Sequence, residues 1–303
     1  MTAGDIPEIK PGVLLAGASG TIGSAVSRAL DEASYPQVCI DRATLADGDR
    51  LQSVLAENDI DTVISCIASR SGAPKDAQAV DCEANLRLLK AAERADVRQF
   101  ILLSAICVQR PILAFQHAKL EFERELAASP IDHTIIRPTA FFKSLSGQVQ
   151  RVARGKPFLI FGDGELTRCK PISDEDLARF MIDCIGREDR TDKILPIGGP
   201  GPAISLRDQG EMLFELTGRA PKFKSVPIGL FDAAIRLFSL GARWTDWMAE
   251  KHEYARIARY YATESMLLLD PENGEYSADK TPEFGTVTLR DHYKRLLEEG
   301  APQ

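Results

Sequence analysis

The sequence predicts an α/β fold in which a parallel β-sheet is covered by helices on both faces. In the first half of the chain, short apolar runs alternate with amphipathic helical stretches, a pattern typical of repeated strand–helix units. The predicted strands are apolar almost throughout, which indicates that both faces of the sheet are buried. A glycine-rich turn between the first strand and the first helix is the third observation that favours this fold.

The elements of the first half follow one another in regular alternation. Each strand is a run of four to six mostly apolar residues, and each helix is longer and has one apolar side. Strands are expected at 13–16, 37–40, 62–67, 99–103 and 133–136, and helices at 22–32, 50–57, 84–95 and 115–128.

The pattern changes after Pro138, where helices become more frequent than strands. A short strand is expected at 158–161, before a Gly-Asp-Gly turn, and the last strand of the sheet at 194–197. Ser173 and Asp176 form a capping-box pattern that begins a helix. Helices are expected at 143–154, 173–185, 205–216, 228–240, 247–262 and 289–299.

The composition is that of an ordinary globular protein, with 303 residues of which 44% are hydrophobic and 27% are charged. The net charge of −7 argues against nucleic acid as a partner, because nucleic-acid-binding proteins usually carry a basic surface. No apolar run approaches the roughly 20 residues of a transmembrane segment. Residues 1–11 are polar and show no signal or transit pattern, so a cytoplasmic location is expected.

The cysteines do not predict a metal site. No CxxC pair occurs, and the spacing fits neither zinc nor an iron–sulfur cluster, so we expect reduced thiols that pack as small core residues. Any electrons for a reaction must then come from a diffusible cofactor. The six cysteines are Cys39, Cys66, Cys82, Cys107, Cys169 and Cys184.

The glycine-rich turn has the spacing and the context of a pyrophosphate-binding turn. Gly17 permits a tight turn, Gly20 lets the backbone approach a pyrophosphate, and Gly23 lets the helix pack close to the sheet. The helix N-terminus then offers free N–H groups to the phosphates. These features predict a Rossmann fold, with a ligand-free glycine turn as the alternative. The residues expected to hold the phosphates are Gly17, Ser19, Gly20, Thr21, Ile22 and Gly23.

The end of the second strand gives opposing indications about the cofactor. A carboxylate there binds the ribose hydroxyls of NAD, whereas an arginine attracts the 2′-phosphate of NADP. Asp41 lies 18 residues after Gly23, and Arg42 follows it directly. The connection at 43–49 is too short for a further helix and strand, so the sheet is expected to lack the strand that usually forms this edge.

The strand expected at 99–103 and the helix expected at 115–128 carry part of a known catalytic motif. Short-chain dehydrogenases place a Ser after one strand and Tyr-x-x-x-Lys on the next helix, and Ser104 and Lys119 occupy the Ser and Lys positions. The Tyr position is Phe115, which cannot exchange a proton, so ordinary alcohol–ketone chemistry is disfavoured. Other strand ends complete the predicted cofactor site, with Ala68, Ser69, Pro138 and Thr139.

Eight stretches of the chain resemble the family of NADPH-dependent 8-vinyl-reductases that act on divinyl chlorophyllide, an atypical branch of the short-chain dehydrogenase/reductase superfamily. The resemblance extends from residue 13 to residue 300. The chain departs from this family in the shortened segment after Asp41. The stretches are 65–70 (SCIASR), 103–109 (LSAICVQ), 137–145 (RPTAFFKSL), 161–164 (FGDG), 169–173 (CKPIS), 195–201 (LPIGGPG), 208–214 (DQGEMLF) and 259–266 (RYYATESM).

The resemblance implies hydride transfer from NADPH, rather than NADH, to the 8-vinyl group of a flat magnesium porphyrin that carries a carboxylate. Phe141, Phe142, Tyr260 and Tyr261 are expected to line an apolar slot for the ring, with ordinary core packing as the alternative. Lys143 is expected to contact the substrate. Arg137, Arg168 and Lys170 are the other basic residues that are candidates to pair with its carboxylate.

The resemblance also implies catalytic roles. Lys119 is expected to hold the nicotinamide ribose, and Cys107 and His117 are candidate proton donors. Two other functions remain open, namely another double-bond reductase of the isoflavone-reductase-like group and an NADP-sensing regulator without catalysis.

The resemblance and the element pattern together predict two domains. Residues 11–200 are expected to form the NAD(P)-binding domain, to which 141–171 add part of the substrate site. Residues 201–303 are expected to form a smaller, mainly helical lobe that covers the substrate.

Overall fold

A computed structural model describes residues 10–242 and 244–300, so most of the polar start at 1–11 and the end of the predicted second lobe lie outside it. Its central sheet has six strands in the order β2-β1-β3-β4-β5-β8, and every neighbouring pair is parallel. This confirms the predicted doubly wound fold. The strands are β1 (Gly12–Ala16), β2 (Gln37–Ile40), β3 (Ile60–Ser65), β4 (Gln99–Leu103), β5 (Asp132–Pro138) and β8 (Lys193–Ile197).

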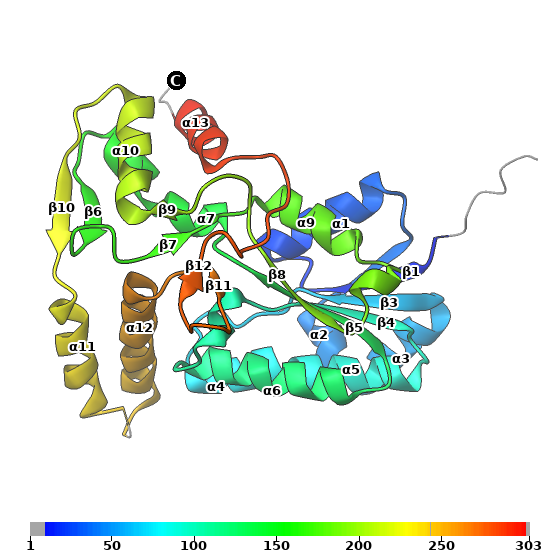
Figure 1. Ribbon diagram of the computed structural model, residues 1–303. Coiled ribbons are helices and arrows are strands. Elements are labelled where there is room, and N and C mark those ends of the chain that lie inside the picture. The colour runs from blue at the N-terminus through cyan, green and yellow to red at the C-terminus, as the bar shows by residue number, and fades with distance from the viewer. Residues whose placement is uncertain (1–9, 243, 301–303) are drawn as a thin grey trace, which may run out of the picture.

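Helices cover both faces of this sheet (Figure 1). Because alternate side chains of a strand point to opposite faces, Val13 and Leu15 of β1 pack in one apolar core and Leu14 and Ala16 pack in another. The first core contains residues of α1 (Thr21–Glu32) and α9 (Asp174–Ile182). The second contains residues of α3 (Gly48–Glu57), α5 (Asn85–Arg94) and α6 (Ala114–Ala128).

The strand order reverses between β1 and β3, and this reversal positions the functional site. Ligands of such sheets bind in the crevice beyond the carboxyl ends of the strands at this point. The short helix α2 (Arg42–Ala46) and α3 fill the connection from β2 to β3, so β2 forms the edge of the sheet. The expected loss of the outer strand is therefore confirmed.

The helix expected at 84–95 begins earlier than the sequence indicates. Residues of α4 (Pro74–Ala77) lead into a π-helix, η1 (Gln78–Ala84), which continues as α5. A π-helical turn is rare and is often found at functional sites. This one lies beside α6, and it brings a buried carboxylate, Asp81, to the carboxyl end of β3.

Beyond the main sheet, the structure contains short strands, most of which the sequence pattern did not predict. β6 (Phe158–Phe161) was predicted, and it pairs in parallel with β10 (Phe223–Val226), which was not. The remaining pairs have only two residues in each strand, too few to show an alternating pattern. They are β7 (Arg168–Cys169) with β9 (Ile204–Ser205), and β11 (Leu268–Leu269) with β12 (Tyr276–Ser277).

The second lobe takes its core from both halves of the chain. Phe142 and Phe158 pack with Leu213 and Tyr293, so residues before 200 share a core with residues after it. The predicted boundary at residue 200 stays a prediction.

The helix expected at 143–154 is divided into three pieces. Apart from α9, the helical elements that follow β5 along the described chain are α7 (Phe142–Leu145), η3 (Ser146–Gln148), α8 (Val149–Ala153), η4 (Glu188–Arg190), α10 (Leu206–Thr217), α11 (Gly229–Ser239), α12 (Asp246–Thr263) and α13 (Leu289–Glu299).

Within residues 10–242 and 244–300, no helix has the length and apolar character required to span a bilayer.

Candidate functional site

The glycine turn is closely packed between β1 and α1. Gly17 has a positive φ of 85°, and its carbonyl accepts a hydrogen bond from the Gly20 N–H at 3.0 Å. A Cβ at Gly23 would lie 2.1 Å from the Gly17 carbonyl oxygen, so only glycine permits this approach of helix and strand. The two glycines have the roles that the sequence predicted for them.

The first turn of α1 is suited to an anion. Gly20 caps the helix without a side-chain hydrogen bond, and the first turn has no acidic residue. Ser19 and Gly20 are exposed, so the uncapped backbone N–H groups at this end are accessible to a phosphate. The Lys143 Nζ donates to the Thr21 hydroxyl at 2.7 Å and adds a positive charge at this turn, and its expected contact with the substrate stays a prediction.

The two residues after β2 have different roles. The Asp41 carboxylate caps α2 by accepting the Thr44 N–H at 2.8 Å, and this hydrogen bond holds the pKa of Asp41 below its usual value. Arg42 is the first residue of α2 and is exposed. Of these two side chains, the Asp41 carboxylate is therefore engaged in the helix cap, whereas the Arg42 guanidinium is exposed.

A buried ion pair joins α6 to the π-helix. The Nζ of Lys119 lies 2.9 Å from Oδ1 of Asp81, and the two side chains are 11% and 0% exposed. The same carboxylate oxygen accepts the Ser69 N–H at 3.4 Å, which ties the loop after β3 to the pair. The other oxygen, Oδ2, is buried and has no hydrogen-bond partner among the described residues. Ala68, which directly precedes Ser69, is exposed.

Ser104 belongs to a second buried polar group. Its hydroxyl donates to Glu123, which also pairs with Arg137, and Ser104 and Glu123 are each 4% exposed. Arg137 therefore already has a buried partner and does not face a substrate carboxylate. The Ser104 hydroxyl is likewise engaged, so its predicted contact with the cofactor stays a prediction.

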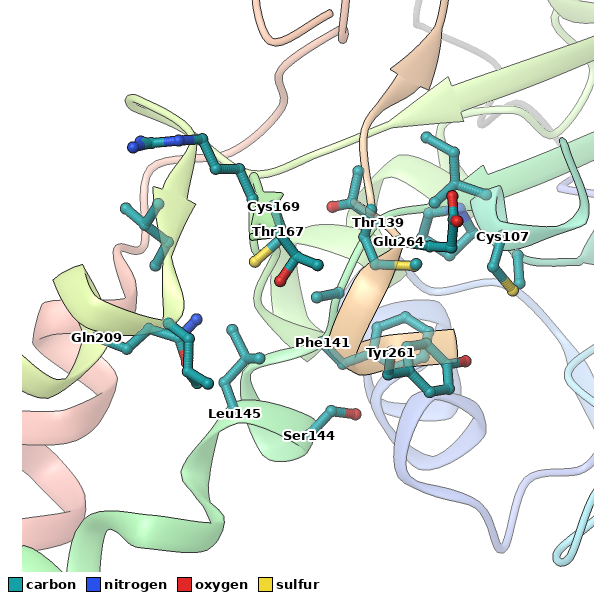
Figure 2. Close-up of a pocket in the computed structure, with 18 of the residues that line it drawn as sticks. Cys107, Thr139, Phe141, Ser144, Leu145, Thr167, Cys169, Gln209, Tyr261 and Glu264 are labelled. Carbon is teal, nitrogen blue, oxygen red and sulfur yellow. The ribbon is translucent and has the colours of Figure 1, made fainter. Parts of the chain in front are cut away.

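A cavity of about 410 Å³ opens beyond the carboxyl ends of β4 and β5 (Figure 2). This volume lies within the range of small-molecule sites, roughly 300–1,000 Å³. Its wall is formed by residues 105–107, 138–141, 144–145, 161 and 167–169, together with residues of the second lobe. The second-lobe residues are Ile204, Leu206, Gln209, Tyr261, Glu264 and Met266.

Five of the predicted site residues border this cavity, namely Cys107, Pro138, Thr139, Phe141 and Tyr261. Figure 2 labels Cys107, Thr139, Phe141 and Tyr261 among the side chains that line it. The Thr139 hydroxyl donates to the Lys170 carbonyl, so Thr139 is held as part of the wall.

Phe142 and Tyr260 do not line the cavity, and the expected four-aromatic slot needs correction. Phe142 is 2% exposed in the core of the second lobe. Tyr260 is 1% exposed, and its hydroxyl donates to the Cys107 carbonyl at 2.8 Å. Their chain neighbours Phe141 and Tyr261 do line the cavity. The two members of each pair differ because consecutive residues of a helix or turn face different directions.

Some of the candidate carboxylate partners and candidate proton donors line the cavity, and others do not. Lys170 is buried and pairs with Glu283, whose side chain is 45% exposed, whereas Arg168 lines the cavity and is about half exposed. His117 is exposed and is not among the residues that line the cavity. Burial raises the pKa of the Cys107 thiol above its usual value, so this thiol keeps its proton at neutral pH.

The remaining thiols are largely as expected. Cys82, Cys169 and Cys184 are buried, but Cys39 is exposed and Cys66 is half-buried, so the expected core packing is wrong for Cys39. Sequence reasoning missed Asp81, Glu264 and Gln209, because only the folded chain brings them to the site.

Comparison with known proteins agrees with this geometry. A family of NAD(P)H-binding proteins matches residues 17–188. The UDP-glucose 4-epimerase of Thermotoga maritima has a similar fold, with a TM-score of 0.67 at 18% identity over 95% of this chain and 97% of that one. The fold, the turn and the family match define a Rossmann protein that binds a nicotinamide dinucleotide.

Two plant relatives identify the branch of this class. The chloroplastic divinyl chlorophyllide a 8-vinyl-reductase of Cucumis sativus is 49% identical over 90% of this chain and 66% of that protein. The rice protein of the same name (Oryza sativa subsp. indica) is 44% identical over 95% of this chain and 79% of its own length. The chain belongs to the divinyl chlorophyllide a 8-vinyl-reductase family. It spans about two thirds of the length of the cucumber relative, at 66%.

Substitutions in the glycine turn should separate cofactor binding from folding. A Cβ at Gly20 would lie 3.3 Å from the Gly17 oxygen, so Gly20→Ala should fold but obstruct a pyrophosphate and weaken NADPH binding about tenfold or more, or about 1.4 kcal/mol. Gly23→Ala should also lose about 1–3 kcal/mol of unfolding free energy from overpacking. Urea unfolding and NADPH fluorescence titration measure the two effects.

Gly48→Ala is the matched control for these variants, since a Cβ there meets nothing within 4 Å. It should change neither quantity noticeably. Normal NADPH affinity in Gly20→Ala would show that the phosphates do not bind at this turn.

Removal of one charge from the buried pair should destabilise the protein. Asp81→Asn leaves the Lys119 ammonium buried without a counter-charge, so the free energy of unfolding should fall by about 3–5 kcal/mol. The exposed pair of Lys75 and Asp246 provides the control, with side chains 83% and 74% exposed. Lys75→Gln should cost less than about 1 kcal/mol in the same urea titration. Equal effects of the two substitutions would contradict a structural role for the buried pair.

Proposed function

We propose that this protein reduces the 8-vinyl group of a divinyl chlorophyllide to an ethyl group, with NADPH as the hydride source. The observation that carries the proposal is membership of the 8-vinyl-reductase family, with plant relatives of that name at 44% and 49% identity. The cavity next to the dinucleotide crevice, bordered by Phe141 and Met266, supports it, because a flat apolar pigment needs an apolar wall.

The residues present fit the cofactor. The uncapped N-terminus of α1 and the open position beside Gly20 suit a pyrophosphate, and Lys143 adds a positive charge there. Lys119 lies at the carboxyl side of the sheet and is the residue proposed to hold the nicotinamide ribose. When bound, the dihydronicotinamide supplies the hydride. Asp81 orients the Lys119 ammonium through their ion pair.

NADPH is proposed over NADH because of the positions of Asp41 and Arg42. Asp41 already accepts the N–H that begins α2, while the Arg42 guanidinium is exposed at the same end of β2. A guanidinium in this position favours a 2′-phosphate.

The substrate carboxylate is proposed to pair with Arg168. This is the one residue of the four basic candidates Arg137, Lys143, Arg168 and Lys170 that lines the cavity. Its side chain is 48% exposed and also contacts Glu165 and Asp208 at the rim. A rim position leaves the charged carboxylate near solvent while the apolar ring enters the cavity.

An anaerobic assay tests the proposed reaction. Purified protein mixed with divinyl chlorophyllide and NADPH should shift the Soret band to the blue as the vinyl group is reduced, and NADH should support a slower shift. Lys119→Ala should lower both turnover and NADPH affinity, because it removes the proposed ribose contact.

Two outcomes of that assay would contradict the proposal. Tight NADPH and pigment binding without any shift would favour an NADP-sensing regulator, and turnover only on another conjugated double bond would favour a related reductase. Full turnover and full NADPH affinity in Lys119→Ala would remove Lys119 from the site.

A second experiment tests the choice of cofactor. Arg42→Ala should weaken NADPH binding about 10- to 100-fold, because a charge-assisted hydrogen bond is worth about 1.5–3 kcal/mol. Its affinity for NADH should stay unchanged, since NADH has no 2′-phosphate. Arg94→Ala, at an exposed position of α5, is the control and should affect neither cofactor. Equal losses for NADPH and NADH in Arg42→Ala would show that Arg42 does not read the phosphate.

A further inference from the structure

The helix α6 has a phenyl ring where a proton-donating tyrosine would be expected. Phe115 is 9% exposed and packs in a core cluster with Tyr260 and Leu113. It lies one helical turn before Lys119, so the position faces the same side of α6 as the ammonium. Reduction of a carbon–carbon double bond needs a proton as well as a hydride, and Phe115 supplies none.

A tyrosine reaches the same region from a different helix. The hydroxyl of Tyr260 anchors α12 by donating to the Cys107 carbonyl at 2.8 Å. Consecutive helical residues point about 100° apart, so burial of Tyr260 turns Tyr261 toward the cavity. The two rings are in edge-to-face contact, 5.8 Å between centroids at 88°. Tyr261 and Phe141 both border the cavity, and Figure 2 labels both among the side chains that line it.

Tyr261 borders the cavity together with Ala105, Ile106 and Cys107, which follow β4. The Cys107 carbonyl accepts the Tyr260 hydroxyl at 2.8 Å, so α12 contacts this segment directly. Tyr261 and Cys107 therefore both lie at the cavity wall beyond the carboxyl end of β4. Tyr261 remains 47% exposed, because its ring borders the open cavity.

We propose that Tyr261 is the proton donor of the reduction. Tyr261, on α12, would supply the proton that Phe115, on α6, cannot supply. The inference rests on the proposed function. The C–H bond of the dihydronicotinamide breaks, and its hydride forms a C–H bond at one vinyl carbon. The Tyr261 O–H bond breaks, and its proton forms a C–H bond at the other carbon. NADPH is oxidised by two electrons, the vinyl group is reduced by two, and water returns a proton to the tyrosinate.

Two other groups at the cavity are less suited to this role. Glu264 accepts hydrogen bonds from Tyr276 at 2.8 Å and from Arg110 at 3.4 Å, so its Oε2 acts as an acceptor. Cys107 is 4% exposed, so its thiol is much less accessible to a pigment in the cavity than Tyr261, which is 47% exposed. Burial raises the pKa of Tyr261 well above its usual value, which keeps the hydroxyl protonated through neutral pH.

The test compares the wild type with Tyr261→Phe in the anaerobic vinyl-reduction assay, with NADPH and pigment dissociation constants measured separately. The substitution should lower kcat about 100- to 10,000-fold, the usual contribution of a positioned acid, and leave both dissociation constants unchanged. Small buffer acids should restore part of the turnover in proportion to their concentration, which a merely structural defect would not allow. Wild-type kcat should stay level from about pH 7 to pH 9, because the raised pKa keeps the proton on the hydroxyl.

Two further variants decide between donors. Tyr254→Phe, on the same helix and 68% exposed, is the matched control and should keep wild-type turnover. Tyr261→His provides a second acid and should gain activity as the pH falls toward about 6.5, where an imidazole becomes protonated. It keeps the inference testable should the phenylalanine variant fold poorly.

Each remaining outcome overturns the inference. Wild-type turnover in Tyr261→Phe would exclude Tyr261 as the donor. If Cys107→Ser also lost turnover, Cys107 would be assigned as the proton donor instead. Absence of vinyl reduction by the wild type itself would overturn the proposed function and this inference together. Activity in the wild type and in Tyr261→Phe would overturn the inference alone.

Discussion

The arrangement of the site depends on one buried ion pair, between Asp81 of the π-helix and Lys119 of α6. Two charges taken out of water are stable only when each compensates the other, so the pair fixes the distance between these two elements. Asp81 also accepts the Ser69 N–H, and this hydrogen bond extends the constraint to the loop after β3. The ion pair thus links α6 to the loop after β3, which lies at the carboxyl end of the sheet.

The glycine turn applies a steric constraint on the other side of the same crevice. Since Gly23 packs against the Gly17 carbonyl, α1 begins directly at the end of β1 and directs its uncapped N–H groups into the crevice. Lys143 contacts this turn from α7, the helix that also carries the cavity residues Ser144 and Leu145. The phosphate end of the cofactor site and the wall of the substrate cavity are therefore parts of one connected unit.

The second lobe contributes the groups that the Rossmann half lacks. Tyr260 anchors α12 to the Cys107 carbonyl, and Tyr261 and Glu264 then face the cavity. The chain thus combines a dinucleotide site built by a regular parallel sheet with a cavity wall built by short, irregular elements. The first part suits any NAD(P)-dependent reaction, and the second part is where we propose that the specificity of this family resides.

The sequence by itself determined the sheet, its covering helices and the phosphate turn. These features depend on local patterns, namely apolar strand runs, helical periodicity and the spacing of Gly17, Gly20 and Gly23. Only the tertiary structure decided the wall of the cavity. Phe142 and Tyr260 turned out to be core residues, Lys143 reached the glycine turn, and Asp81 paired with Lys119. The physical reason is that a side chain's partner far along the chain is set by packing between elements, and no local pattern records it.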